Sequence, residues 1–130
     1  MNKSEQLSPL ALAFLGDSIH TAYVRKKVLE GQLNKINNYH NQAKKFCNAK
    51  NQKDALEKVL PLLSDDENDI VRRARNSHSK HSAKNFDEET YKKATAFEAL
   101  VGFLYLNERK EKLFTILDIS MQEKEVKNEN

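Results

Sequence analysis

Helix-breaking residues are scarce in this chain, which has only 3 glycines and 2 prolines among its 130 residues. Apolar residues recur at three- and four-residue spacings, and no stretch alternates long enough to predict a strand. We therefore expect an all-α fold. The helices are predicted at about 9–29, 35–47, 51–60, 65–75, 88–106 and 109–120, with a polar loop at about 76–86. The fifth is apolar nearly all round, which predicts that it lies at the centre of the molecule.

The length fits one domain, which we expect to cover residues 1–121, with 122–130 as a disordered tail. No apolar run approaches the roughly 18 residues of a membrane-spanning helix. The N-terminus lacks the apolar core of a secretory signal, and the single cysteine, Cys47, cannot form an internal disulfide. These features predict a cytoplasmic protein.

Two glycines, Gly16 and Gly102, fall inside helical patterns, where each costs about 1 kcal/mol relative to alanine. Each is close to an acid set among apolar residues, Asp17 and Glu98. In the simpler interpretation, each acid faces solvent or pairs with a nearby cation. Alternatively, the two helices cross at the glycines and both acids converge on one divalent cation. Mg²⁺ suits such a site, because it accepts one or two carboxylates and can activate water beside a phosphate.

The residues around these acids resemble two motifs of the ribonuclease III family. The run Leu12-Ala13-Phe14-Leu15-Gly16-Asp17-Ser18 is similar to L-E-F-L-G-D-S/A, and Phe97-Glu98-Ala99-Leu100-Val101-Gly102 is similar to F-E-A-L-I-G. The family carries two further carboxylates, at whose positions this chain has Ala13 and Thr95. That pattern, in 130 residues that we expect to be too short to include a double-stranded-RNA-binding domain as well, resembles the Mini-ribonuclease III subfamily.

Two other stretches carry the same resemblance. The segment 73–85 is similar to R-G-R-N-A-K-S-G-T-T-P-K-N, and His40 with Ala49-Lys50-Asn51-Gln52 is similar to H-x-x-A followed by S-A-K-x-Q. Together the similar stretches span roughly residues 10 to 108, nearly the whole predicted fold.

The resemblance implies an all-helical endonuclease domain that forms a homodimer and cuts double-stranded RNA. Catalysis is implied to need Mg²⁺, with Mn²⁺ as an alternative ion, held by Asp17 and Glu98 as catalytic and metal-binding residues. The products are implied to carry 5′-phosphate and 3′-hydroxyl ends, and the substrate to be the 23S ribosomal RNA precursor, with a ribosomal protein as a further candidate partner. Because two acids are missing, a non-catalytic RNA-binding or ribosome-assembly module is the alternative function. A helical interaction protein unrelated to RNA is a third.

The positive charge of the chain is concentrated in one segment. Five basic residues and no acid lie between Asp69 and Asp87, and since the whole chain carries +3, the rest carries −2. Such a segment can be an ordinary solvated face, but its density favours contact with RNA phosphates. The residues predicted to bind RNA, here and by resemblance, are Arg72, Arg73, Arg75, Asn76, Lys80, Lys84, Lys50 and Gln52.

Overall fold

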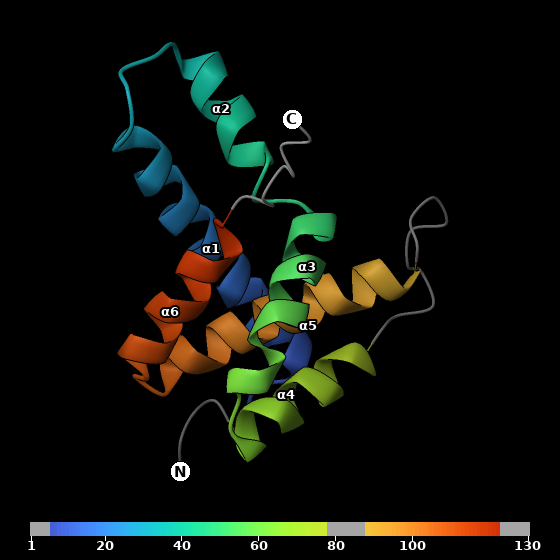
Figure 1. Cartoon of the computed structure of the whole chain (residues 1–130). Coiled ribbons are helices and arrows are strands. Elements are labelled where there is room, and N and C mark those ends of the chain that lie inside the picture. The colour runs from blue at the N-terminus through green and yellow to red at the C-terminus, as the bar shows by residue number, and fades with distance from the viewer. Residues whose placement is uncertain (1–5, 78–87, 123–130) are drawn as a thin grey trace, which may run out of the picture.

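The computed structural model of the chain describes residues 6–77 and 88–122, and within these ranges it contains helices and no strand. In chain order the elements are α1 (Pro9–Leu29), α2 (Ile36–Lys44), α3 (Ala49–Val59), the 3₁₀ helix η2 (Leu60–Leu62), α4 (Asp65–Arg75), α5 (Glu88–Leu106) and α6 (Lys110–Ser120) (Figure 1). The all-α prediction is confirmed. None of these helices is long and apolar enough to cross a membrane.

Local sequence signals set most of the helix ends. The Ser8 hydroxyl accepts a hydrogen bond from the Ala11 backbone N–H at 3.0 Å, and Pro9 occupies the first turn of α1. Pro61 ends α3 as predicted, because the helix stops at Val59 and continues only as η2. By contrast, α2 ends a few residues before the predicted boundary, where the chain tightens into a turn closed by a Phe46 N–H to Ala43 carbonyl bond of 3.0 Å.

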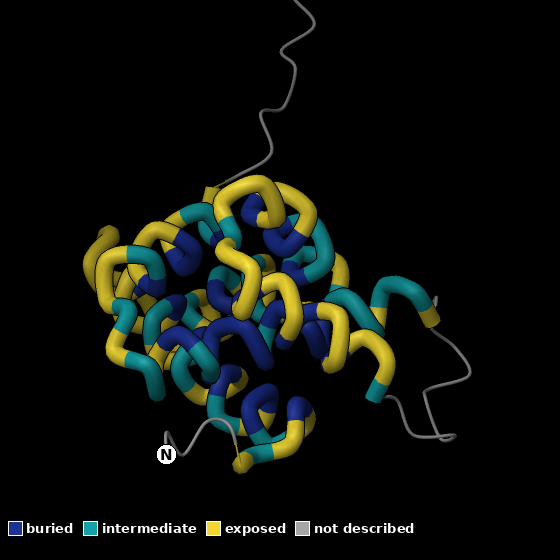
Figure 2. The backbone as a smooth tube through the Cα atoms, turned by 90° about the horizontal axis from the view of Figure 1, so that it is seen from below, coloured by how far each residue is buried: buried dark blue, intermediate teal, exposed yellow. Residues whose placement is uncertain are grey.

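The central position predicted for the fifth helix is confirmed. α5 packs against α1, α3, α4 and α6, and its most extensive contact is with α1. Phe97, Leu100 and Leu104 are fully buried along it. Figure 2 shows the buried parts of the chain gathered inside the surrounding helices. α5 is therefore the element against which α1, α3, α4 and α6 are assembled.

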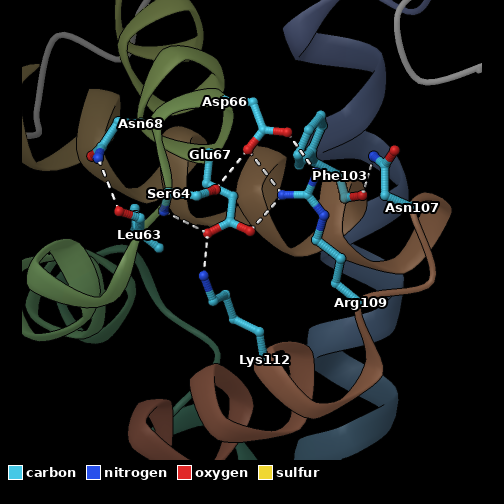
Figure 3. A network of polar contacts seen from close by, with 9 residues as sticks. All are labelled: Leu63, Ser64, Asp66, Glu67, Asn68, Phe103, Asn107, Arg109 and Lys112. Atoms are coloured by element: carbon cyan, nitrogen blue, oxygen red, sulfur yellow. Dashed lines mark hydrogen bonds and ion pairs between the residues drawn. The ribbon is translucent and has the colours of Figure 1, made fainter.

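An ion-pair network centred on one buried carboxylate fastens α4 to α6 (Figure 3). Glu67 is only 1% exposed and accepts hydrogen bonds from Arg109 at 2.6 Å and from Lys112 at 2.7 Å. It also accepts one from the Ser64 backbone N–H at 2.9 Å, which is half of the predicted capping box. Burial alone would raise the pKa of Glu67, but these donors outweigh it and lower the pKa, so the carboxylate stays charged.

Some predicted features lie outside the described residues. These are most of the polar loop, including Lys80 and Lys84, and the tail beyond Gln122.

Candidate active site

The helices α1 and α5 cross with their backbones in direct contact at the two glycines. A Cβ atom on Gly16 would lie 1.7 Å from the Glu98 carbonyl oxygen, and a Cβ atom on Gly102 would lie 2.2 Å from the Leu12 carbonyl oxygen. Neither position can hold any side chain without moving a helix. The glycines therefore offset their cost within a helix by permitting this close approach, and the predicted crossing is confirmed.

The crossing brings Asp17 and Glu98 together. Asp17 is exposed, Glu98 lies deeper, and the two carboxyl groups are within hydrogen-bonding reach of each other. Burial, followed by the neighbouring Asp17, raises the pKa of Glu98 to about 8. Two acids held this close repel one another when both are ionised, and the raised pKa expresses that conflict. A divalent cation would relieve it, because it lets both oxygens keep their negative charge.

The donor set fits a hard cation. Both groups offer carboxylate oxygens, and Mg²⁺ commonly takes one or two of these while keeping several water ligands. Within the part of the chain that the structure describes, no group of three or more His, Cys, Asp or Glu side chains could hold a metal. Asp17 and Glu98 form a pair of carboxyl groups, which could supply two of the ligands of such a cation.

The two positions that lack the family's acids supply no replacement ligand. Ala13 is buried, and the Thr95 hydroxyl, also buried, donates to the carbonyl of Tyr91 at 3.1 Å. The nearby Lys93 forms an ion pair of 2.8 Å with Glu57 on α3. The Thr95 bond closes one turn within α5, and the Lys93 pair joins α5 to α3.

A chain of polar side chains lies behind Glu98. The amide nitrogen of Gln52, on α3, is 3.5 Å from Glu98 Oε2 and 3.3 Å from His20 Nδ1. His20 Nε2 lies 3.1 Å from the hydroxyl of Ser120, at the end of α6. Burial lowers the pKa of His20 to about 4, although Asp17 opposes this, so the imidazole is neutral.

The residues predicted to bind RNA fall into two groups. Arg72, Arg73, Arg75 and Asn76 are exposed at the end of α4, and Lys50 is exposed on the first turn of α3. Within the first group, Arg72 pairs with Asp69 at 2.5 Å and Arg75 pairs with Glu89, so each cation is held on the surface by a neighbouring acid.

Gln52 differs from its predicted environment. It is 7% exposed, and its amide is engaged with His20 and Glu98, which places it behind the acid pair instead of on the surface. A buried amide with two internal partners is poorly placed to contact RNA.

The sequence assigns no definite role to His20, although its spacing holds a signal. It falls on the buried stripe of α1 at four-residue intervals between Gly16 and Val24, where a polar side chain needs an internal partner. Ser120 carries no such signal, because its partner lies 100 residues away in the chain.

Comparison with known proteins agrees with this geometry. The family model of the ribonuclease III domain matches residues 10–109, so the fold is that of an all-helical nuclease domain. A protein from Fusobacterium nucleatum solved by X-ray crystallography superposes with a TM-score of 0.80 at 34% identity, over 87% of this chain and 90% of that one.

Curated relatives narrow the class further. "Mini-ribonuclease 3" of Thermoanaerobacter sp. (strain X514) is 41% identical over 116 residues, covering 89% of this chain and 82% of the relative. "Mini-ribonuclease 3" of Staphylococcus aureus is 40% identical over 119 residues, covering 90% and 89%. The chain therefore belongs to the ribonuclease III family, within its Mini-ribonuclease III subfamily. It is an endoribonuclease that acts on double-stranded RNA, and its family uses a divalent metal ion.

Proposed function

We propose that Asp17 and Glu98 are the catalytic pair of a Mg²⁺-dependent endoribonuclease that matures the ends of the 23S ribosomal RNA precursor in the cytoplasm. The observation that carries this proposal is the glycine-to-glycine crossing of α1 and α5, which forces two acids together at a partly exposed point. Packing alone does not require two helices to approach so closely that no Cβ atom fits between them. Here the close approach also brings together two carboxyl groups that repel each other. The names of the relatives support a ribonuclease, and the ribosomal substrate is part of the proposal.

The two acids differ in how far they are exposed to solvent, and this suits them to different roles. Asp17, being exposed, is placed to meet both solvent and a phosphate, whereas Glu98 is anchored on the central helix. Asp17 and Glu98 would hold the cation, Mg²⁺ or in its place Mn²⁺, which when bound would supply an activated water for phosphodiester hydrolysis and positive charge beside the phosphate. Hydrolysis in this family leaves 5′-phosphate and 3′-hydroxyl ends. Among the described residues the pair offers two carboxyl groups, so water would be expected to supply most of the remaining ligands of a bound Mg²⁺.

The basic end of α4 would hold the duplex. Arg72, Arg73 and Arg75, joined by Lys80 and Lys84 in the following segment and by Lys50 on α3, offer cations to the phosphates on either side of a minor groove, and Asn76 offers a neutral hydrogen-bonding group. Such contacts carry shape recognition and depend strongly on salt.

A homodimer is part of the proposal. Leu10 is 43% exposed and Phe14 is 84% exposed, and the two lie one turn apart on the same face of α1. An aromatic ring left this open on a well-packed domain marks a contact surface, for which a second copy of the chain is the family's usual partner. A ribosomal protein is a further proposed partner. Sedimentation of the purified protein as a monomer would contradict the dimer.

The test is cleavage of a duplex RNA with Mg²⁺ and then with excess EDTA. Wild-type protein should give fragments only with metal, and Asp17→Asn should lower the rate by at least about 100-fold, since a ligand that stabilises developing charge is lost. Asp65→Asn, an exposed acid on α4, is the matched control and should cleave normally.

The alternative function predicts a different outcome. A non-catalytic RNA-binding module would retain the RNA and yield no fragments with or without metal. Full activity of the Asp17→Asn variant would show that the acid pair is not the catalytic centre.

A further inference from the structure

The donors and acceptors among the polar side chains behind Glu98 can be assigned one after another, starting from Ser120. The Ser120 hydroxyl donates to the Leu117 carbonyl at 2.6 Å, so its single proton is taken. Its oxygen must therefore act as the acceptor in the 3.1 Å contact with His20 Nε2. The proton of the neutral imidazole consequently resides on Nε2, and Nδ1 is left as an acceptor.

This tautomer fixes the orientation of Gln52. Because Nδ1 accepts, the group that faces it at 3.3 Å must be the amide N–H₂ of Gln52 and not its carbonyl oxygen. The second N–H of the same nitrogen is then directed at Glu98 Oε2, 3.5 Å away. A Gln52 amide turned by 180° would instead present its oxygen to His20 Nδ1, where an acceptor would meet an acceptor.

Burial makes this arrangement difficult to exchange with water. His20 is fully buried, Ser120 is 1% exposed and Gln52 is 7% exposed. The imidazole also stands edge-on against Phe97, with ring centroids 5.1 Å apart, so the ring is held between α1 and α5. Four helices thus contribute one group each to a chain of hydrogen bonds that runs from the end of α6 to Glu98.

We propose that Gln52 is a positioning residue that orients Glu98 for metal binding, and that His20 and Ser120 select the working orientation of its amide. The inference rests on the proposed function, because it takes Glu98 as a metal ligand. Gln52 touches neither the RNA nor the cation. It holds one carboxylate oxygen by donation, which leaves the other oxygen available to a cation. Partners of this kind behind a ligand commonly change metal affinity by about 10–100-fold.

The first test uses Gln52→Met, which keeps the length of the side chain and removes its donors. Binding of Mn²⁺ to the full chain without RNA, measured by calorimetry, should weaken by about tenfold or more. In Mg²⁺-dependent cleavage, the Mg²⁺ concentration at half-maximal rate should rise, while KM for the duplex at saturating Mg²⁺ stays unchanged. Unaltered Mn²⁺ binding, or a raised KM with normal metal dependence, would overturn the proposal, the latter by making Gln52 an RNA contact.

The second test changes Ser120, at the other end of the chain of hydrogen bonds from Glu98. Ser120→Ala removes the acceptor that holds the proton on Nε2, which frees His20 to change tautomer and Gln52 to turn its oxygen toward Glu98. Thr115→Val is the matched control, because it also removes a hydroxyl that donates to a backbone carbonyl of α6, in this case that of Glu111 at 2.9 Å. Ser120→Ala should weaken Mn²⁺ binding in the same direction as Gln52→Met, and the control should not.

The failure of this inference and the failure of the proposed function would give different experimental results. If Ser120→Ala lowers only the melting temperature and leaves Mn²⁺ binding intact, the chain of hydrogen bonds is structural and the inference fails. If wild-type protein shows no Mg²⁺-dependent cleavage, the proposed function fails, whereas the effect of Gln52 on Mn²⁺ binding is still measured directly.

Discussion

At the scale of single residues, the acid pair combines two carboxyl groups with different surroundings. Asp17 meets solvent, whereas Glu98 is packed on the central helix beside Asp17. Burial and Asp17 together raise the pKa of Glu98 to about 8. Without a cation, the folded protein therefore binds a proton at Glu98 at a pH where the unfolded chain has released it.

This shift has a consequence for stability. A group whose pKa is raised on folding stabilises the fold below its unfolded value, near 4.5, and that stability is lost as the pH rises through about 8. Metal-free wild-type protein should therefore lose stability between pH 5 and pH 8 relative to Glu98→Gln, which cannot ionise. We expect a difference on the order of 1–2 kcal/mol, reduced from the full linkage value because solvent screens a partly exposed group.

Urea denaturation of both proteins at pH 5 and pH 8 in EDTA measures the difference. Repeating the pH 8 measurement with millimolar Mg²⁺ should close the gap, because a cation that binds only the folded wild type stabilises it. A gap that does not depend on pH would contradict the assigned pKa.

At the scale of elements, the crossing of α1 and α5 determines where the site is. Helix positions followed from the apolar spacing, and the cost of two glycines inside helices predicted a close approach. Spacing alone could not prove which helices meet, since many pairs satisfy the same pattern. The contact between Gly16 and the backbone of Glu98 resolves this, because it sets the backbones of α1 and α5 directly against each other.

Gly16→Ala should therefore damage both fold and site. With 1.7 Å between the new Cβ and the Glu98 carbonyl oxygen, α1 and α5 must separate, and we expect a loss of at least about 3 kcal/mol, at the upper end of the cost of overpacking. Thermal or urea unfolding measures the loss.

Gly31→Ala is the control for this change. At Gly31 the nearest atom to a new Cβ is the Val28 carbonyl oxygen at 3.4 Å, an ordinary contact. That variant should stay within about 0.5 kcal/mol of wild type. Equal stability of the two variants would show that the close approach is not needed.

At the scale of the whole molecule, charge is divided between a basic end and a mildly acidic remainder. The exposed arginines lie at the end of α4, and the junction of α1 and α2 is at the opposite end of the molecule (Figure 1). A net charge of +3 would give little attraction to RNA if it were spread evenly. We therefore expect the protein to attract RNA mainly at the basic end of α4.

Replacing Arg72 and Arg73 together by glutamine should weaken binding to a duplex RNA by about tenfold at low salt. The slope of log affinity against log salt should also fall by about 1 to 2, since each arginine that neutralises a phosphate adds about 1 to it. Filter-binding titrations at several salt concentrations measure both. The control is Lys26→Gln with Lys27→Gln, two exposed lysines on the last turn of α1. An equal weakening of RNA binding in the control variant would contradict the prediction that the arginines at the end of α4 bind the RNA.

Local sequence information was enough to predict the helical class, the central position of α5, the two acids and the uneven charge. Each of these depends on composition or on neighbours within a few residues. The setting of Glu98 depends instead on tertiary packing. His20 and Ser120 are 100 residues apart, and Gln52, which the sequence predicts to face RNA, lies buried between His20 and Glu98. The direction of these hydrogen bonds depends on which side chains come into contact when four helices pack together. The spacing of residues along the sequence does not contain that information.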